Sequence, residues 1–66
     1  MYLTEKEKEI LKEMDRGMDY TIDVLAFFTH QDVTESIMWG LLEYGFVTRH
    51  DNAWAITAAG YRASRA

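Results

Sequence analysis

The sequence predicts a fold that is mainly α-helical with one small antiparallel β-hairpin, in the α+β class. Apolar residues recur at helical spacing in three segments, and each segment follows a Thr or Asp that can cap a helix. Residues 46–48 and 53–57 instead show the alternation with a period of two residues that is typical of the two strands of a hairpin. With 66 residues and 48% hydrophobic side chains, the chain is expected to form one domain, residues 1–66, around a small core.

The first helix is expected over residues 5–16. Thr4 and Glu7 form a capping-box pattern, in which each side chain accepts a hydrogen bond from a free backbone N–H group of the first turn. Gly17 is the expected stop. The side chains of this segment that the helical spacing assigns to the core are Ile10, Leu11, Met14 and Met18.

The second helix follows residues 18–20, which we interpret as a single edge strand. Thr21 is expected to cap this helix, and Asp23 lies in its first turn, where the helix dipole favours a carboxylate. Residues 29–31 are predicted to form a tight turn. The buried stripe predicted for this helix consists of Ile22, Leu25, Ala26 and Phe28.

The third helix is expected over residues 32–44, with Asp32 as its N-cap and Glu35 three positions later. Gly45 is expected to end this helix in a left-handed conformation, and Phe46 then packs back on Leu41 in a Schellman motif.

The hairpin comes next, with residues 49–52 as the turn between its two strands. Thr57 is expected to cap a last short helical segment over residues 58–65, which Gly60 weakens because glycine is a poor helix former.

The third helix has two chemically different sides when its residues are advanced by about 100° each. The side predicted to face the core carries Thr34, Ile37, Met38, Leu41 and Tyr44. The side predicted to face solvent carries Asp32, Glu35, Ser36, Trp39, Gly40 and Glu43.

Charge is distributed unevenly along the chain, whose formal net charge is −4. No Lys or Arg occurs between Gly17 and Thr48, whereas that stretch contains five Asp and Glu residues. Lys and Arg side chains that neutralise phosphates supply most of the non-specific affinity of proteins for duplex DNA. The middle of the chain therefore has the charge of a surface that repels nucleic acid.

Three segments nevertheless carry the pattern of a known family. Residues 41–49 (LLEYGFVTR) look like the end of a recognition helix and a first wing strand, residues 54–61 (WAITAAGY) like a second wing strand and its ending, and residues 3–11 like a first helix. In this order they resemble the winged helix-turn-helix domains of transcriptional regulators. The resemblance implies three helices plus a wing, with the third helix in the major groove of DNA.

Two functions remain open. The first is a non-enzymatic module that binds a basic protein surface, such as that of a nucleic-acid-binding protein, through an exposed Trp among carboxylates. In size and charge the chain resembles phage proteins that mimic DNA or inhibit host defence, such as anti-CRISPR proteins. The residues predicted to carry this function are Asp32, Glu35, Ser36, Trp39 and Glu43, extended by Asp19 and Asp23.

The alternative is a DNA-binding transcriptional regulator, which the family resemblance favours and which is expected to be dimeric. The residues that would touch phosphates or bases are Gln31, Thr34, Ser36, Arg49, His50, Arg62 and Arg65. A structural interpretation stands beside both functions: Trp39 packs over the wing or the second helix, and the acidic residues are ordinary solvated charges. Both a monomer and a homodimer are compatible with the sequence.

Catalysis is not expected. His30 and His50 lie in predicted turns, the chain has no Cys, and Ser36 and Ser64 have no evident base, so we predict no metal site, no cofactor and no enzyme. No apolar run approaches the roughly 18 residues of a membrane span, and the N-terminal residues are charged rather than signal-like. A soluble cytoplasmic protein without a membrane partner is the expectation.

Overall fold

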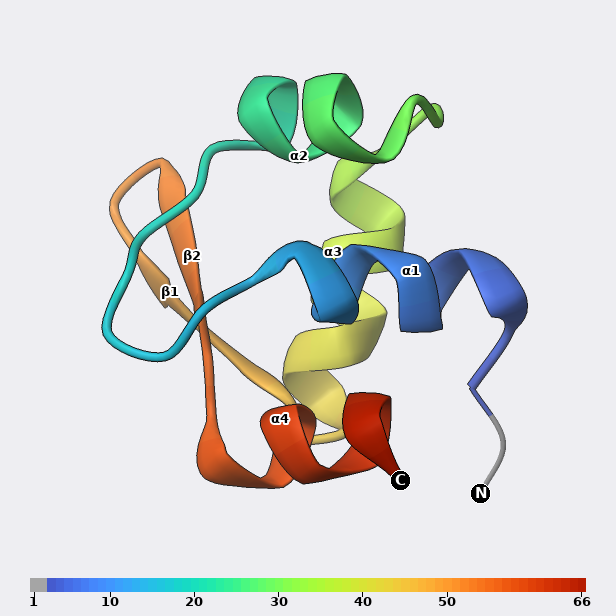
Figure 1. Ribbon diagram of the computed structural model, residues 1–66. Coiled ribbons are helices and arrows are strands. Elements are labelled where there is room, and N and C mark those ends of the chain that lie inside the picture. Colours follow the sequence, from blue (N-terminus) through green and yellow to red (C-terminus); the bar gives the residue numbers. More distant parts are fainter. Residues whose placement is uncertain (1–2) are drawn as a thin grey trace.

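The computed structural model describes residues 3–66, which form four helices and a two-stranded antiparallel sheet (Figure 1). This architecture confirms the predicted α+β class, and the last helical segment is a full helix in addition to the three that the predicted fold contained. The elements are α1 (Glu5–Glu13), α2 (Ile22–Thr29), α3 (Glu35–Glu43), β1 (Val47–His50), β2 (Ala53–Ile56) and α4 (Ala58–Arg65).

The helices surround one hydrophobic core, and the hairpin closes one side of it. Figure 1 shows α2 at one end of the molecule, α4 at the other, and α1 crossing in front of α3. The helix α1 packs against both α2 and α4, and α3 packs against β1. The buried hydrophobic side chains are Ile10, Leu11, Met14, Tyr20, Leu25, Val33, Met38, Leu41, Val47, Trp54 and Ile56.

The predicted capping box opens α1. The N–H of Glu7 donates to the Thr4 hydroxyl at 3.1 Å, and the N–H of Thr4 donates to the Glu7 carboxylate at 2.8 Å. The helix ends at Glu13, earlier than predicted, because Met14 turns into the core with an extended backbone. Met18 therefore lies beyond the helix and is exposed, so its assignment to the core was wrong.

Of residues 18–20, which were predicted to form a single edge strand, only Tyr20 pairs with the sheet. Its backbone exchanges two hydrogen bonds with Trp54 of β2, at 2.8 and 2.7 Å. Its hydroxyl accepts a hydrogen bond from the N–H of Asp15 at 2.8 Å, which ties the end of α1 to the sheet.

The two middle helices both begin at a threonine. Thr21 caps α2 as predicted, accepting from the N–H of Val24 at 3.3 Å. Thr34 caps α3 by accepting from the N–H of Ile37 at 3.3 Å, so the prediction of Asp32 as N-cap was wrong. The cause is Val33, which is buried in the core and is followed by an extended residue, so that helical geometry begins only at Glu35.

The predicted core faces of α2 and α3 are each correct except at their margins. In α2, Leu25 is buried and Ile22 and Ala26 are partly buried, whereas Phe28 is exposed. Phe28 was assigned to the core by its apolar character, although its direction on the helix lies closer to Val24 than to Leu25.

In α3, Met38 and Leu41 are buried and Ile37 is partly buried, as predicted. Thr34 and Tyr44 are exposed, against the prediction. Thr34 serves as the N-cap, and Tyr44 is the C-cap residue, whose ring packs on that of Phe46 with centroids 5.7 Å apart.

The predicted Schellman motif ends α3. The N–H of Gly45 donates to the carbonyl of Leu42 at 2.9 Å, and the N–H of Phe46 donates to the carbonyl of Leu41 at 3.0 Å. Gly45 has a φ of 80°, where glycine is unstrained. The chain thereby reverses into the hairpin.

The strands of the hairpin pair Val47 with Ile56 and His50 with Ala53. The first strand therefore runs two residues further than predicted, and the turn is only Asp51 and Asn52 rather than residues 49–52. Asp51 has a φ of 56°, the left-handed conformation that tight hairpins require and that Asp tolerates.

The helix α4 follows Thr57, whose hydroxyl accepts from the N–H of Gly60 at 3.0 Å and donates to the carbonyl of Gly45 at 2.7 Å. Gly60 is buried, and a Cβ atom at this position would overlap the backbone carbonyl of Phe46. Glycine is therefore required here by the close approach of α4 to residue 46, whatever its cost in helix propensity.

Candidate functional site: an acidic face beside the hairpin

The N-terminal ends of α2 and α3 and the tip of the hairpin surround a shallow hollow of about 360 Å³. The residues that line it are Thr21, Ile22, Asp23, Glu35 and Asn52. Asp23 and Glu35 belong to the first turns of their helices, where a carboxylate interacts favourably with the helix dipole. The fold thus brings to one hollow two carboxylates that the sequence separates by most of α2 and a loop.

The other predicted acidic residues widen this side of the molecule. Asp32 and Glu43 are exposed, as are Ser36 and Asp19, so every polar residue predicted for protein binding is available to solvent. Asp19, Asp32 and Glu43 do not line the hollow, and we call the hollow together with these exposed carboxylates the acidic surface.

Trp39 lies at the border between this acidic surface and the hairpin. Its ring stands nearly perpendicular to that of the buried Trp54, at 88°, with ring centroids 5.5 Å apart. Trp39 nevertheless keeps 41% of its surface exposed. The indole therefore packs over the hairpin, as the structural interpretation expected, and a large part of it remains exposed to solvent.

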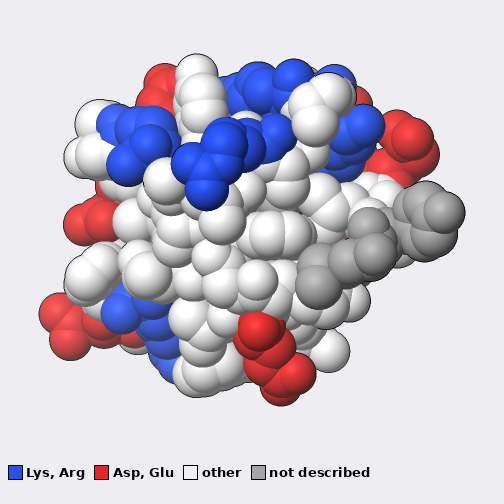
Figure 2. Space-filling model, turned by 90° about the horizontal axis from the view of Figure 1, so that it is seen from below, with Lys and Arg blue, Asp and Glu red and all other residues white. Residues whose placement is uncertain are grey.

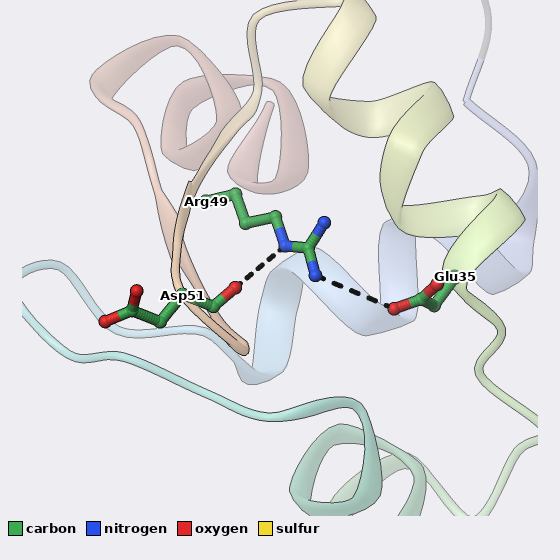
Figure 3. A network of polar contacts seen from close by, with 3 residues as sticks. All are labelled: Glu35, Arg49 and Asp51. Atoms are coloured by element: carbon green, nitrogen blue, oxygen red, sulfur yellow. Dashed lines mark hydrogen bonds and ion pairs between the residues drawn. The ribbon is translucent and has the colours of Figure 1, made fainter.

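The side chain of Arg49, in β1, lies between the hairpin and α3. Its guanidinium carbon is 5.0 Å from the ring centroid of Trp39 and 5.2 Å from that of Trp54. One guanidinium nitrogen is 3.8 Å from a carboxylate oxygen of Glu35, and the Nε donates to the carbonyl of Asp51 at 2.9 Å (Figure 3). Arg49 therefore links the hairpin to the start of α3.

The energetic weight of this link is modest. The side chain of Glu35 is 64% exposed and that of Arg49 is 32% exposed. Solvent screens such an ion pair, whereas cations over indole rings contribute roughly 0.5–1 kcal/mol each at exposed sites. The aromatic contacts, more than the ion pair, therefore hold Arg49, and Glu35 retains most of its access to solvent.

Arg65, which the alternative function assigned to phosphates, is occupied at the other end of the molecule. Its guanidinium donates to the carbonyls of Leu11 and Lys12, at 3.0 and 2.9 Å, and thereby caps the C-terminus of α1. The same group lies 4.1 Å from the ring centroid of Tyr61. A helix C-terminus favours a cation, so this contact explains Arg65 as a structural residue.

The remaining residues of the alternative set do not form a basic surface. Thr34 uses its hydroxyl as a helix cap, Gln31 is partly buried, and His50 lies 3.4 Å from the hydroxyl of Thr48 through its Nε2. Arg62 is exposed on α4, at the opposite end of the molecule from α2 (Figure 1).

Positive charge is concentrated away from the acidic surface. Apart from Arg49, the Lys and Arg residues belong to residues 6–16 and to α4, which pack together. Viewed from the α4 end, Lys and Arg gather along one edge of the surface (Figure 2). We call the exposed part of residues 17–48, which carry five acidic and no Lys or Arg side chains, the acidic side. The helices α1, with three Lys and four Glu, and α4, with two Arg, form the more basic side, whose formal charge is +1.

One exposed feature was missed by the sequence reasoning. Val24, Phe27 and Phe28 project from α2 into solvent. The available signal was the helical spacing itself, because Phe27 lies four residues after Asp23 and hence on the same side of the helix.

Comparisons of the chain with models of protein families, with curated proteins and with solved structures find no match. Within residues 3–66, no helix has the length and apolar character needed to cross a membrane. In the same part of the chain, no three His, Asp or Glu side chains are grouped so that they could hold a metal ion.

Proposed function

We propose that this protein is a non-enzymatic binding module that uses its acidic side to bind a basic surface of another protein. The binding surface consists of the Asp23–Glu35 hollow, the exposed part of Trp39, and the neighbouring carboxylates. One observation carries the proposal: within residues 3–66 the only ion pair joins Arg49 to Glu35, and Arg49 also lies against Trp39 and Trp54. The remaining carboxylates face solvent without neutralisation.

The chemistry of this surface favours protein over nucleic acid. Carboxylates repel phosphates, and two of the basic residues that would have to offset the repulsion, Arg49 and Arg65, are held by internal contacts. A partly exposed Trp next to acidic residues has the composition of an interaction hot spot that steers basic surfaces toward it. A partner that itself binds nucleic acid would present such a surface, so the module would act as a mimic of DNA or as an inhibitor.

A DNA-binding regulator is the second candidate, and the order of elements favours it. A helix, a single strand-like residue at Tyr20, two further helices and a hairpin follow one another as in winged helix-turn-helix domains, whose third helix reads the major groove. Here that helix would present Glu35 and Glu43 to DNA, with no Lys or Arg of its own. We therefore favour a winged-helix arrangement used for protein recognition over one used for DNA reading.

Charge reversal tests the proposal. A helical peptide of alanine and lysine is titrated against the wild type and against the Glu35→Lys/Glu43→Lys variant. We expect the variant to bind at least roughly tenfold more weakly, because each exposed ion pair contributes up to about 1 kcal/mol and the substitutions add repulsion. Circular dichroism checks that both proteins are folded.

The matched control reverses two acidic residues of α1, Glu9→Lys/Glu13→Lys, which are equally exposed but lie outside the acidic side. This control variant should bind the peptide nearly as well as the wild type. Equal losses in the two variants would mean that only net charge matters, and the proposed site would then be rejected.

A further inference from the structure

The outer face of α2 exposes three large apolar side chains, which we call the α2 apolar face: Val24, Phe27 and Phe28. Phe27 keeps 73% and Phe28 48% of its surface in contact with solvent. The two rings touch in an edge-on arrangement, with centroids 5.8 Å apart and planes at 61°. They therefore form one continuous patch rather than two scattered residues.

This patch is not explained by the packing of the chain. The core side of α2 is complete without it, because Leu25 is fully buried and Ile22 and Ala26 pack around it. Exposed apolar surface is unfavourable in water, and burial of the two adjacent rings against another molecule would be favourable. Binding of another molecule over the α2 apolar face would therefore lower the free energy by removing these side chains from water.

The position of the α2 apolar face connects it with the acidic hollow. Phe27 lies one helical turn after Asp23 on the same side of α2, and Asp23 lines the hollow with Glu35. No Lys or Arg occurs in residues 17–48, so the charged residues of α2, α3 and their connections are all acidic. A ligand that covers the rings therefore meets negative charge at their edge.

Area and charge distinguish two occupants of the α2 apolar face, a second copy of this chain and a different protein. A Phe ring contributes about 200 Å² at most, so the two exposed rings offer roughly 250 Å², well below the about 800 Å² that each partner of a stable interface buries. A second copy that paired through this face alone would bury too little. It would also oppose two acidic segments of the same sequence.

We propose that the α2 apolar face receives apolar side chains of a partner protein that carries Lys or Arg directly beside them. The rings bind the apolar residues, and Asp23 and Glu35 bind the neighbouring cations, so that both halves together form an interface of sufficient area. This inference rests on the proposed function, because it specifies the partner of the same acidic side: an amphipathic segment with a basic border, rather than a uniformly basic surface.

Three synthetic helical peptides test this inference by titration at moderate salt. One is built of alanine and lysine, one is amphipathic with leucine and lysine, and one is amphipathic with leucine and glutamate. We expect the leucine–lysine peptide to bind at least roughly tenfold more tightly than the alanine–lysine peptide, because burial of apolar area adds to the electrostatic attraction. The leucine–glutamate peptide should not bind.

The Phe27→Gln/Phe28→Gln variant should bind the leucine–lysine peptide only as well as the alanine–lysine peptide. Glutamine keeps helix propensity close to or above that of phenylalanine, and both positions are exposed, so the variant stays folded. Met18→Gln is the matched control, since it removes an exposed apolar side chain from the same acidic segment but outside α2 and should leave affinity unchanged.

Five results would overturn the inference. Unchanged affinity of the Phe27→Gln/Phe28→Gln variant would show that the rings are not used, and equal binding of the leucine–glutamate peptide would show that the border charge does not matter. Sedimentation that detects a dimer of the wild type, lost in that variant, would identify a second copy as the occupant. If the alanine–lysine peptide binds and the leucine–lysine peptide binds no better, only this inference fails; if neither binds, the proposed function fails with it.

Discussion

Arg49 is the residue on which the two candidate functions differ most. Its guanidinium lies against two Trp rings and near Glu35, and these contacts leave it turned toward the protein rather than toward a ligand. In a DNA-binding role this side chain would have to leave the rings to reach a phosphate. In the proposed role it instead competes with the cations of the partner for Glu35.

Substitution of Arg49 by Gln separates these roles. We expect the variant to lose roughly 1 kcal/mol of stability, because the contacts with the two indole rings disappear. Its affinity for the alanine–lysine peptide should rise, since Glu35 is then free and one positive charge is gone. Thermal unfolding and titration measure the two effects.

Arg62→Gln is the control, because it removes the same charge from the basic side of the molecule. It should raise the affinity for the peptide less than Arg49→Gln does. A weaker affinity after Arg49→Gln would contradict the account, since it would mean that Arg49 contacts the ligand directly.

Two helical glycines show how an element depends on its surroundings. Gly60 of α4 lies against the backbone of Phe46, whereas a Cβ atom at Gly40 of α3 would meet no other atom within 4 Å. Intrinsic helix propensity treats the two alike, and only the packing of the elements distinguishes them.

We expect Gly60→Ala to destabilise the protein by roughly 1–3 kcal/mol, because α4 or residue 46 must move to make room for the methyl group. Gly40→Ala should instead stabilise it by up to about 1 kcal/mol, since alanine is the better helix former. Denaturant unfolding of both variants measures the difference, and equal effects of the two substitutions would show that α4 does not approach Phe46 as closely as described.

Elements whose determinants lie within a few residues could be predicted from the sequence. The capping box at Thr4 and the Schellman motif at Gly45 each depend on hydrogen bonds between near neighbours, and both are present. The start of α3 could not be predicted in the same way. It depends on the burial of Val33 by distant residues, and this contact moves the cap from Asp32 to Thr34.

The candidate site, too, could be predicted only where its determinants lie within a few residues. The solvent-facing side of α3 could be predicted from helical periodicity, because one angle decides it. The contact between Arg49 and Trp39 joins the hairpin to α3, and the shared hollow joins α2 to α3. Neither contact is visible in a linear pattern. Phe28, by contrast, was misassigned because its apolar character was given more weight than its direction on the helix.

At the scale of the whole molecule, charge is divided between two sides. Residues 17–48, which include α2 and α3, carry five acidic and no Lys or Arg side chains, and most Lys and Arg residues lie on α1 and on α4, at the opposite end of the molecule from α2 (Figure 1). Such a division orients the molecule toward a basic partner before contact and is screened by salt. The proposed binding is therefore expected to be fastest and tightest at low ionic strength.

A parallel titration with mixed-sequence duplex DNA and with the leucine–lysine peptide best distinguishes binding of a basic protein surface from binding of DNA. It is carried out at about 50 mM salt, where non-specific DNA binding is strong. The account predicts that the peptide binds, that its affinity falls as salt is added, and that DNA does not bind at high micromolar protein. Clear, salt-sensitive binding of DNA without binding of the peptide would contradict it and would identify the domain as a reader of nucleic acid.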